Sequence, residues 1–167
     1  MIPRLHELRP RAILLPVLLL HSLRHLGLMF VARGATDPGM PATFAYPAAF
    51  GDLLAAVLAV VAIPFVVAEA TAGKPLVWLF NVIGSLDVLA AVVLANAYDA
   101  GPYLGAAYWI PAFWVPALLV THYLTFVVLW RDRTAGRIKT AIPAGESGVV
   151  YPAARHEATF GAKKHTR

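Results

Sequence analysis

The sequence contains no cysteine and little charge, and each shortage excludes a class of protein. Without cysteine the chain has no disulfide framework, no thiolate metal site and no thiol redox centre. Only 14% of its 167 residues are charged and 59% are hydrophobic, whereas typical soluble domains carry about 25% charged residues. The sequence also lacks a phosphate-binding glycine-rich loop and the HExxH motif of zinc proteases. This composition is typical of a membrane protein and predicts no enzyme activity.

What the sequence does contain is a set of four long apolar runs. They cover residues 12–32, 46–69, 75–96 and 109–130. At 1.5 Å per residue, a helical run of about 20 residues crosses a hydrocarbon layer of ~30 Å. We therefore expect an all-α integral membrane four-helix bundle over residues 12–130, preceded by a short cytoplasmic segment over residues 1–11. The first run is too long, and too polar in its middle, for a cleaved signal peptide, so we expect it to remain as a helix.

Lysine and arginine residues are concentrated at one end of the predicted bundle. The N-terminal segment and the chain after the fourth run are rich in arginine, and Lys74 lies in the second connection. At the other end, the first connection contains only Arg33 and the third contains neither residue type. The positive-inside rule therefore places both termini in the cytoplasm of a multi-pass protein, which we expect in a bacterial inner membrane. The net charge of +5 follows from these flanking residues, which attract anionic lipids and indicate no nucleic-acid partner.

Residues 131–167 differ in composition from the rest of the chain. They are polar, contain several Gly, Pro and Ala residues and show little apolar periodicity, so they cannot bury a core of their own. We expect an extended cytoplasmic tail. A tail of this kind is held in place only by something that it lies on, which favours a partner in a membrane complex.

Ionisable residues within the apolar runs are the main candidates for a functional site. Counting from the cytoplasmic end of each run places Arg24 about 20 Å deep and Asp87 about 18 Å deep. An unpaired arginine at mid-bilayer costs at least ~2.5–3.5 kcal/mol, so we expect an ion pair between Arg24 and Asp87 inside the bundle. Asp52 offers a second acidic contact, to Arg24 or to Arg33. Such a group is either a structural clamp, which we favour, or a proton or ion relay.

Three histidines belong to the same predicted intramembrane polar core. His21 and His25 are four residues apart and share a face of a first α-helix, while His122 of the fourth helix reaches the level of His21. Facing histidines on two helices can hold a haem iron, with His21 and His122 as the candidate ligands. The alternative is hydrogen bonding between helices. The neighbouring Arg24 favours this alternative because its charge opposes the binding of a further cation, and we expect no metal ion.

The third run carries small and polar residues at a spacing of three. Asn81, Gly84 and Asp87 recur in this way, and Gly51 with its neighbouring alanines offers a small surface on the second run. Small and polar residues let membrane helices approach closely and form hydrogen bonds across the contact. We therefore expect a tight seam between the two helices, with Asn81 bonded to a histidine or to a backbone carbonyl.

Three stretches of the sequence carry a family resemblance. They are "PAAFGD" at residues 47–52, "NVIGSLD" at residues 81–87, and the proline- and histidine-bearing "IPAFWVPALLVTHYL" at residues 110–124. Together they resemble a group of small bacterial four-span membrane proteins of unknown function, with an arginine in the first helix and the motifs PAxxGD and WNxxGxxD. Here Trp78 is separated from Asn81 by two residues, which departs from the second motif. The resemblance covers roughly residues 20–130. It implies that the following residues belong together: Arg24, Asp52, Asn81, Asp87 and His122.

Three functions are compatible with these observations. The one we favour is a non-catalytic accessory or structural subunit of a larger bacterial membrane protein complex, held in the lipid bilayer by helix packing and by residues 131–167. The second is a small autonomous transporter or proton-coupled protein that uses Arg24, Asp87 and Asp52. The third is a membrane protein that binds haem b. The first two require no cofactor.

Overall fold

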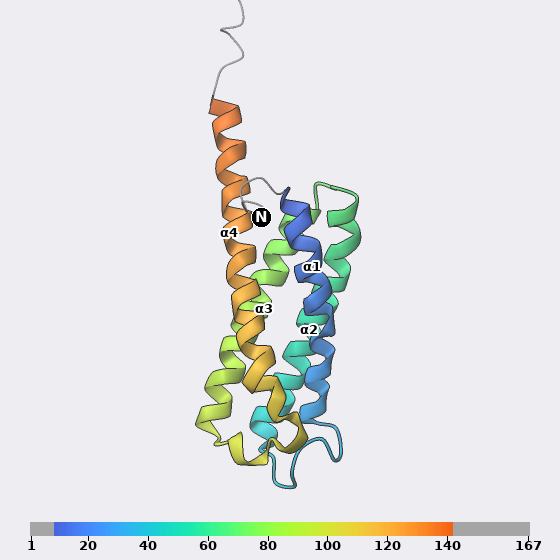
Figure 1. Cartoon of the computed structure of the whole chain (residues 1–167), viewed down its shortest axis with the longest axis vertical. Coiled ribbons are helices and arrows are strands. Elements are labelled where there is room, and N and C mark those ends of the chain that lie inside the picture. Colours follow the sequence, from blue (N-terminus) through green and yellow to red (C-terminus); the bar gives the residue numbers. More distant parts are fainter. Residues whose placement is uncertain (1–8, 142–167) are drawn as a thin grey trace, which may run out of the picture.

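The structure, a computed structural model, describes residues 9–141, with side chains for residues 9–133. Within this part of the chain the named elements are helices, and four spans are long and apolar enough to cross a membrane. Figure 1 shows the long helices aligned along one axis. The elements are α1 (Pro10–Ser22), η1 (Leu23–Phe30), α2 (Ala42–Val67), α3 (Gly73–Ala97), η2 (Gly101–Tyr103), η3 (Gly105–Tyr108), η4 (Ile110–Trp114) and α4 (Val115–Ala141).

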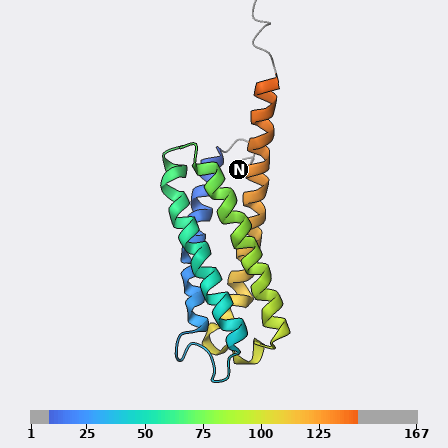
Figure 2. The same cartoon turned by 180° about the vertical axis from the view of Figure 1, so that it is seen from behind.

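The four predicted runs correspond to the four spans, but their ends differ. α2 begins four residues before the predicted start, at Ala42, so Pro47 lies inside the helix instead of at its first turn. The largest difference is in α4, which continues as a helix to Ala141. The extended tail that we predicted from residue 131 is therefore wrong for its first eleven residues (131 to 141), and the remainder of that tail lies outside the described residues. Figure 2 shows α4 projecting past the other helices.

The first span changes its winding halfway along. After Ser22, eight residues form the 3-10 helix η1 instead of continuing the α-helix. A 3-10 helix has three residues per turn, so residues at positions i and i+3 lie in one row. The buried residues of η1 are Arg24, Gly27 and Phe30, which have this spacing. The winding therefore directs one row of side chains into the bundle, where η1 packs against α2.

The second span packs through a stripe of alanines. Its buried residues recur at spacings of three and four, which is typical of one helix face. Most of them are small: Ala45, Ala48, Ala49, Ala55, Ala56, Ala59 and Ala62. Short side chains let α2 lie close to α1, η1 and α3. Asp52 lies in the middle of this stripe, so the close packing brings its carboxylate toward the interior.

Buried apolar residues form two clusters, one in each half of the bundle. The cluster nearer the start of α1 includes Leu18 and Phe80. The cluster at the other end includes Phe30 and Ile110. In each span, the buried polar residues fall between the members of these two clusters. The bundle therefore places a polar layer between two apolar ones.

Candidate functional site

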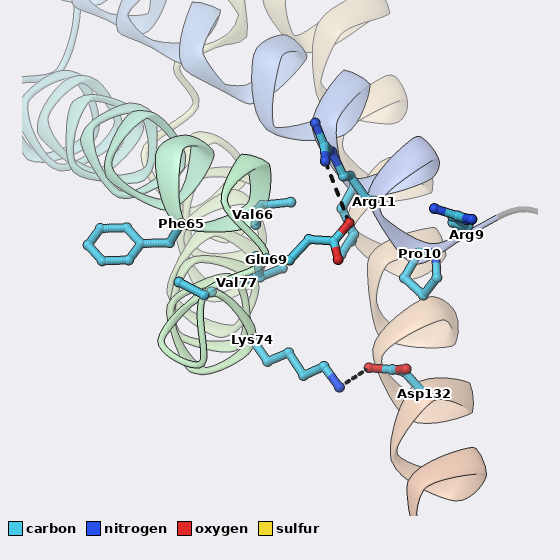
Figure 3. Close-up of a pocket in the computed structure, with 12 residues that line it drawn as sticks. Arg9, Pro10, Arg11, Phe65, Val66, Glu69, Lys74, Val77 and Asp132 are labelled. Atoms are coloured by element: carbon cyan, nitrogen blue, oxygen red, sulfur yellow. Dashed lines mark ion pairs between the residues drawn. The ribbon is translucent and has the colours of Figure 1, made fainter.

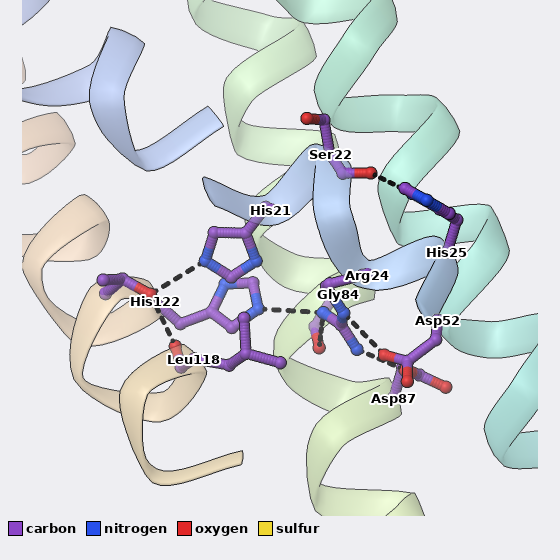
Figure 4. A network of polar contacts seen from close by, with 10 residues as sticks. His21, Ser22, Arg24, His25, Asp52, Gly84, Asp87, Leu118 and His122 are labelled. Atoms are coloured by element: carbon purple, nitrogen blue, oxygen red, sulfur yellow. Dashed lines mark hydrogen bonds and ion pairs between the residues drawn. The ribbon is translucent and has the colours of Figure 1, made fainter. Parts of the chain in front are cut away.

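The polar layer contains side chains from all four spans, and we call it the polar cluster. Its members are His21 of α1, Arg24 of η1, Asp52 of α2, Asn81 and Asp87 of α3, and Thr121 and His122 of α4. Figure 4 shows the guanidinium of Arg24 lying between His122 on one side and the two carboxylates on the other. The side chain of Arg24 is fully buried. Among the described residues, Arg24 is the largest residue that is fully buried.

Arg24 connects η1 to each of the other three spans. Its Nε donates to Asp52 Oδ1 at 2.7 Å, and its Nη2 donates to Asp87 Oδ2 at 2.5 Å. Its Nη1 donates to the Gly84 carbonyl at 3.1 Å and to His122 Nε2 at 3.2 Å. The ion pair between Arg24 and Asp87 that we expected from their depths is therefore present. Asp52 is the second acidic partner, and its contact is also with Arg24. Burial of a charge is tolerated where pairing and hydrogen bonds offset its lost hydration.

The protonation of His122 follows from its partners. A guanidinium has donors only, so Nε2 of His122 accepts the hydrogen bond from Arg24. The proton of the neutral imidazole is then on Nδ1, which donates to Asn81 Oδ1 at 2.8 Å. The Asn81 amide donates in turn to the His122 carbonyl at 3.2 Å. His122 is therefore a neutral residue with protein partners on both ring nitrogens, and Asn81 bonds both a histidine and a backbone carbonyl.

His21 extends the cluster along α4. Its Nε2 lies 2.9 Å from Thr121 Oγ1, and that hydroxyl also donates to backbone carbonyls of α4 at 3.0 Å. The His21 ring packs against those of His122 and Phe80, with centroid distances of 4.3 Å and 5.0 Å. Its Nδ1 is buried without a partner among the described residues.

Three glycines make room for the polar cluster. A Cβ atom on Gly27 of η1 would overlap the carboxylate of Asp52, and one on Gly51 of α2 would overlap that of Asp87. A Cβ atom on Gly84 of α3 would lie 2.7 Å from the imidazole and 3.0 Å from the guanidinium of the cluster. Real Cβ contacts below 3.0 Å are essentially absent from proteins. Each glycine therefore allows a polar group to come as close as its hydrogen bonds require.

The structure brings six of the seven predicted core residues together, and the exception is His25. This residue is exposed on η1, and its Nδ1 lies 2.9 Å from the Ser22 carbonyl. Our prediction that it shares a face with His21 assumed a continuous α-helix. The 3-10 winding that begins at Leu23 rotates His25 away from that face.

Sequence reasoning missed two contributors to the site. Thr121 is the hydrogen-bond partner of His21 and directly precedes His122 in the sequence. Gly27 makes room for Asp52 and follows Arg24 by three residues, which is the period of the 3-10 helix. This spacing was the available signal, but a period of three is also common in α-helices and did not single out the glycine.

The charges of the polar cluster are unequal, because one guanidinium pairs with two carboxylates. The carboxylates also keep some contact with the surroundings, since the side chains of Asp52 and Asp87 are 12% and 15% exposed. A small cavity of about 50 Å³ lies beside Asp52, lined partly by Val88 and Trp114. The cluster could therefore act as a clamp between helices or accept one further proton.

A family model covers most of the chain. The model, described as a domain of unknown function (DUF8737), matches residues 1–130. The chain belongs to the DUF8737 family. The match includes every residue of the polar cluster of this DUF8737 chain and ends before the projecting part of α4. Searches of curated proteins and of solved structures give no match. The matched family is thus one of unknown function, as the resemblance implied, and its description includes no membrane or bacterial assignment.

Proposed function

We propose that this chain is a non-catalytic accessory subunit of a larger complex in a bacterial inner membrane, with both termini in the cytoplasm. Membrane insertion is supported by the outward surface of the spans, which exposes many large apolar residues, among them Leu19, Leu54, Leu89 and Val120. An exposed apolar surface of this extent is unusual for a soluble monomer but is the normal surface of a helix in lipid. The orientation is supported by the basic residues at the end where the described chain begins.

The polar cluster supports a structural role within that subunit. Helices in lipid gain no hydrophobic driving force from packing on one another, so polar contacts and close fit hold them together. Arg24 bonds to the three other spans through one side chain. Both ring nitrogens of His122 are likewise bonded within the protein. These groups fix the positions of the helices and have few bonds left for a substrate, which favours a non-catalytic function.

The observation that carries the accessory role is the projection of α4 beyond the bundle (Figure 1). Its direction is fixed where it leaves, because Lys74 Nζ lies 2.5 Å from Asp132 Oδ2 and the Arg133 guanidinium lies 4.3 Å above the Trp78 ring. The helix then continues over residues 134–141. Helices in proteins gain most of their stability from tertiary packing of one face. A partner protein that packs on this projecting segment would provide such packing.

Truncation after Arg133 tests this proposal. The shortened chain keeps both contacts at the base of the projection, so the bundle is expected to fold normally. On native gels of membranes solubilised in a mild detergent, we expect the full chain in a large complex and the shortened chain alone. Full-length Arg33→Gln is the control, because Arg33 is exposed at the other end of the bundle. If the full chain migrates alone, or the truncated chain stays in the complex, the accessory role is wrong.

A proton-coupled transporter is the second candidate, and the unequal charges of the polar cluster favour it. A surplus carboxylate in an apolar interior is costly unless a proton or cation neutralises it. Asp87→Asn removes the surplus carboxylate and leaves the Arg24–Asp52 pair. In proteoliposomes that contain a pH-sensitive dye, we expect this variant to lose proton flux if the chain is a transporter. No flux with the wild-type chain excludes this candidate.

Haem binding, the third function considered, finds no support in the geometry. Two axial ligands lie on opposite faces of a porphyrin, whereas the rings of His21 and His122 have centroids only 4.3 Å apart. Both nitrogens of His122 also have protein partners. An absorption spectrum of the purified chain checks this directly, since a Soret band would require a different arrangement of the two histidines.

A further inference from the structure

A cavity of about 460 Å³ lies at the end of the bundle where α1 and α3 begin. Part of its wall is apolar and consists of Leu14, Phe65, Val66 and Val77. Charged residues of α1, α3, α4 and the α2–α3 connection form its rim (Figure 3). The cavity is distinct from the polar cluster, and the residues that line the two sites do not overlap. Its combination of a charged rim and an apolar wall fits an amphiphilic ligand.

The charges on the rim favour an anion. Arg9, Arg11 and Lys74 are cationic, and Glu69 and Asp132 are anionic, which gives a surplus of one positive charge (three minus two). Arg11 Nη1 lies 3.5 Å from Glu69 Oε1, and Lys74 Nζ lies 2.5 Å from Asp132 Oδ2. These two pairs leave Arg9 without an ion-pair partner among the residues whose side chains are described. The rim therefore has one cation available for the anionic group of a ligand.

The depth of the cavity matches the layout of a phospholipid. Three of the spans begin or end at this level, at Pro10, Val67 and Gly73, and α4 passes it where Asp132 contacts Lys74. The apolar residues Leu14 and Val77 lie four positions further along their helices, about 6 Å deeper at 1.5 Å per residue. A phosphate at the rim would thus lie at headgroup level, and the beginning of an acyl chain would contact the apolar wall.

We propose that this cavity binds an anionic phospholipid of the cytoplasmic leaflet, with the phosphate beside Arg9 and the upper acyl chain against Leu14 and Val77. The proposal rests on the proposed membrane insertion and orientation, but not on an accessory role. A lipid fits better than a soluble anion because the apolar wall would otherwise remain in contact with water. An anionic headgroup fits better than a zwitterionic one because the rim carries a surplus positive charge.

Native mass spectrometry of the full chain, purified and stripped of lipid, tests the proposal. The chain is titrated with phosphatidylglycerol or with phosphatidylcholine that has the same acyl chains, and we expect several-fold stronger retention of phosphatidylglycerol. Each juxtamembrane cation contributes roughly fivefold to the binding of anionic lipid. Arg9→Gln is therefore expected to weaken phosphatidylglycerol binding about fivefold. Glu69→Gln is expected to strengthen it by a similar factor, and Arg33→Gln, the matched control, is expected to leave it unchanged.

Several outcomes would overturn this assignment. Equal retention of the two lipids would show that the rim does not select an anion, and unchanged binding in both Arg9→Gln and Glu69→Gln would place the lipid elsewhere. Competition by glycerol phosphate at the same concentration as the lipid would indicate a soluble anion. If phosphatidylglycerol binds only after residues 1–8 are deleted, the chain's own N-terminal segment fills the cavity. Native gels of the wild-type chain separate the two proposals, because a chain that migrates in the large complex but does not retain phosphatidylglycerol refutes lipid binding alone.

Discussion

Removal of Arg24 is expected to destabilise the bundle far more than neutralisation of either carboxylate. Methionine in Arg24→Met has a comparable length but no charge, so Asp52 and Asp87 are left largely buried without a counter-charge. Loss of one partner of a buried ion pair costs about 3–5 kcal/mol. Two carboxylates and the Gly84 carbonyl lose their donor here. We therefore expect a loss near the upper end of this range, about 5 kcal/mol.

The carboxylate variants should behave differently because of the unequal charges. Asp87→Asn retains an acceptor for Arg24 and leaves a one-to-one pair between Arg24 and Asp52. The hydrogen bond that Arg24 donates changes from one between two charged groups to one between a charged and a neutral group, which we expect to be weaker by roughly 1 kcal/mol. Asp52→Asn is expected to cost a similar amount. The double variant leaves the guanidinium without a counter-charge, so its loss is expected to return to about 3–5 kcal/mol.

Reversible unfolding in mixed micelles, followed by circular dichroism as the SDS fraction rises, gives these free energies. The four chains that differ at Asp52 and Asp87 form a double-mutant cycle, in which the double variant should lose clearly more than the sum of the singles. Arg33→Gln, on an exposed connection, should stay within about 0.5 kcal/mol of the wild type. Additive losses, or a single neutralisation as damaging as Arg24→Met, would refute the argument from unequal charges.

Three further predictions concern packing and hydrogen bonding. Gly51→Ala is expected to lower the unfolding temperature because its Cβ atom would overlap a carboxylate, whereas Gly101→Ala meets no atom within 4 Å and should leave it unchanged. Asn81→Leu removes the hydrogen-bond partner of two groups of His122, its Nδ1 and its backbone carbonyl. We therefore expect the same unfolding assay to show a decrease of about 1–3 kcal/mol in the free energy of unfolding. Trp114→Phe deletes an indole N–H that is buried without a partner among the described residues, so stability should hold or rise, and a loss above about 1 kcal/mol would contradict this.

Much of the fold could be predicted because hydrophobic runs and bilayer thickness constrain helix positions. Counting residues along each run was enough to place Arg24 level with Asp87, and the structure forms that pair. The same counting placed His21 level with His122, and their rings are in contact. Depth depends only on the rise per residue, which varies little between α-helices.

What could not be predicted depends on helix rotation and on contacts outside the spans. The direction of His25 depends on the switch to three residues per turn in η1, and the sequence of that segment contains no proline that marks the change. The continuation of α4 past residue 130 coincides with two contacts between distant residues. These are the pairs Lys74–Asp132 and Trp78–Arg133. Composition alone does not reveal that a polar segment has such partners, and we therefore expected an extended tail.

The 3-10 winding of η1 also affects how the first span fits a bilayer. Its eight residues rise about 2.0 Å each instead of 1.5 Å, so the 21-residue span reaches about 36 Å, close to the roughly 37 Å of the 25-residue α3. Rewinding η1 as an α-helix would shorten the span by about 4 Å and rotate Phe30 by about 120° relative to Arg24. A thinner membrane that favoured the shorter form would therefore turn either the arginine or the phenylalanine toward lipid. If the bundle lies in a membrane as proposed, the thickness of that membrane would act on which side chains of η1 face the interior of the bundle.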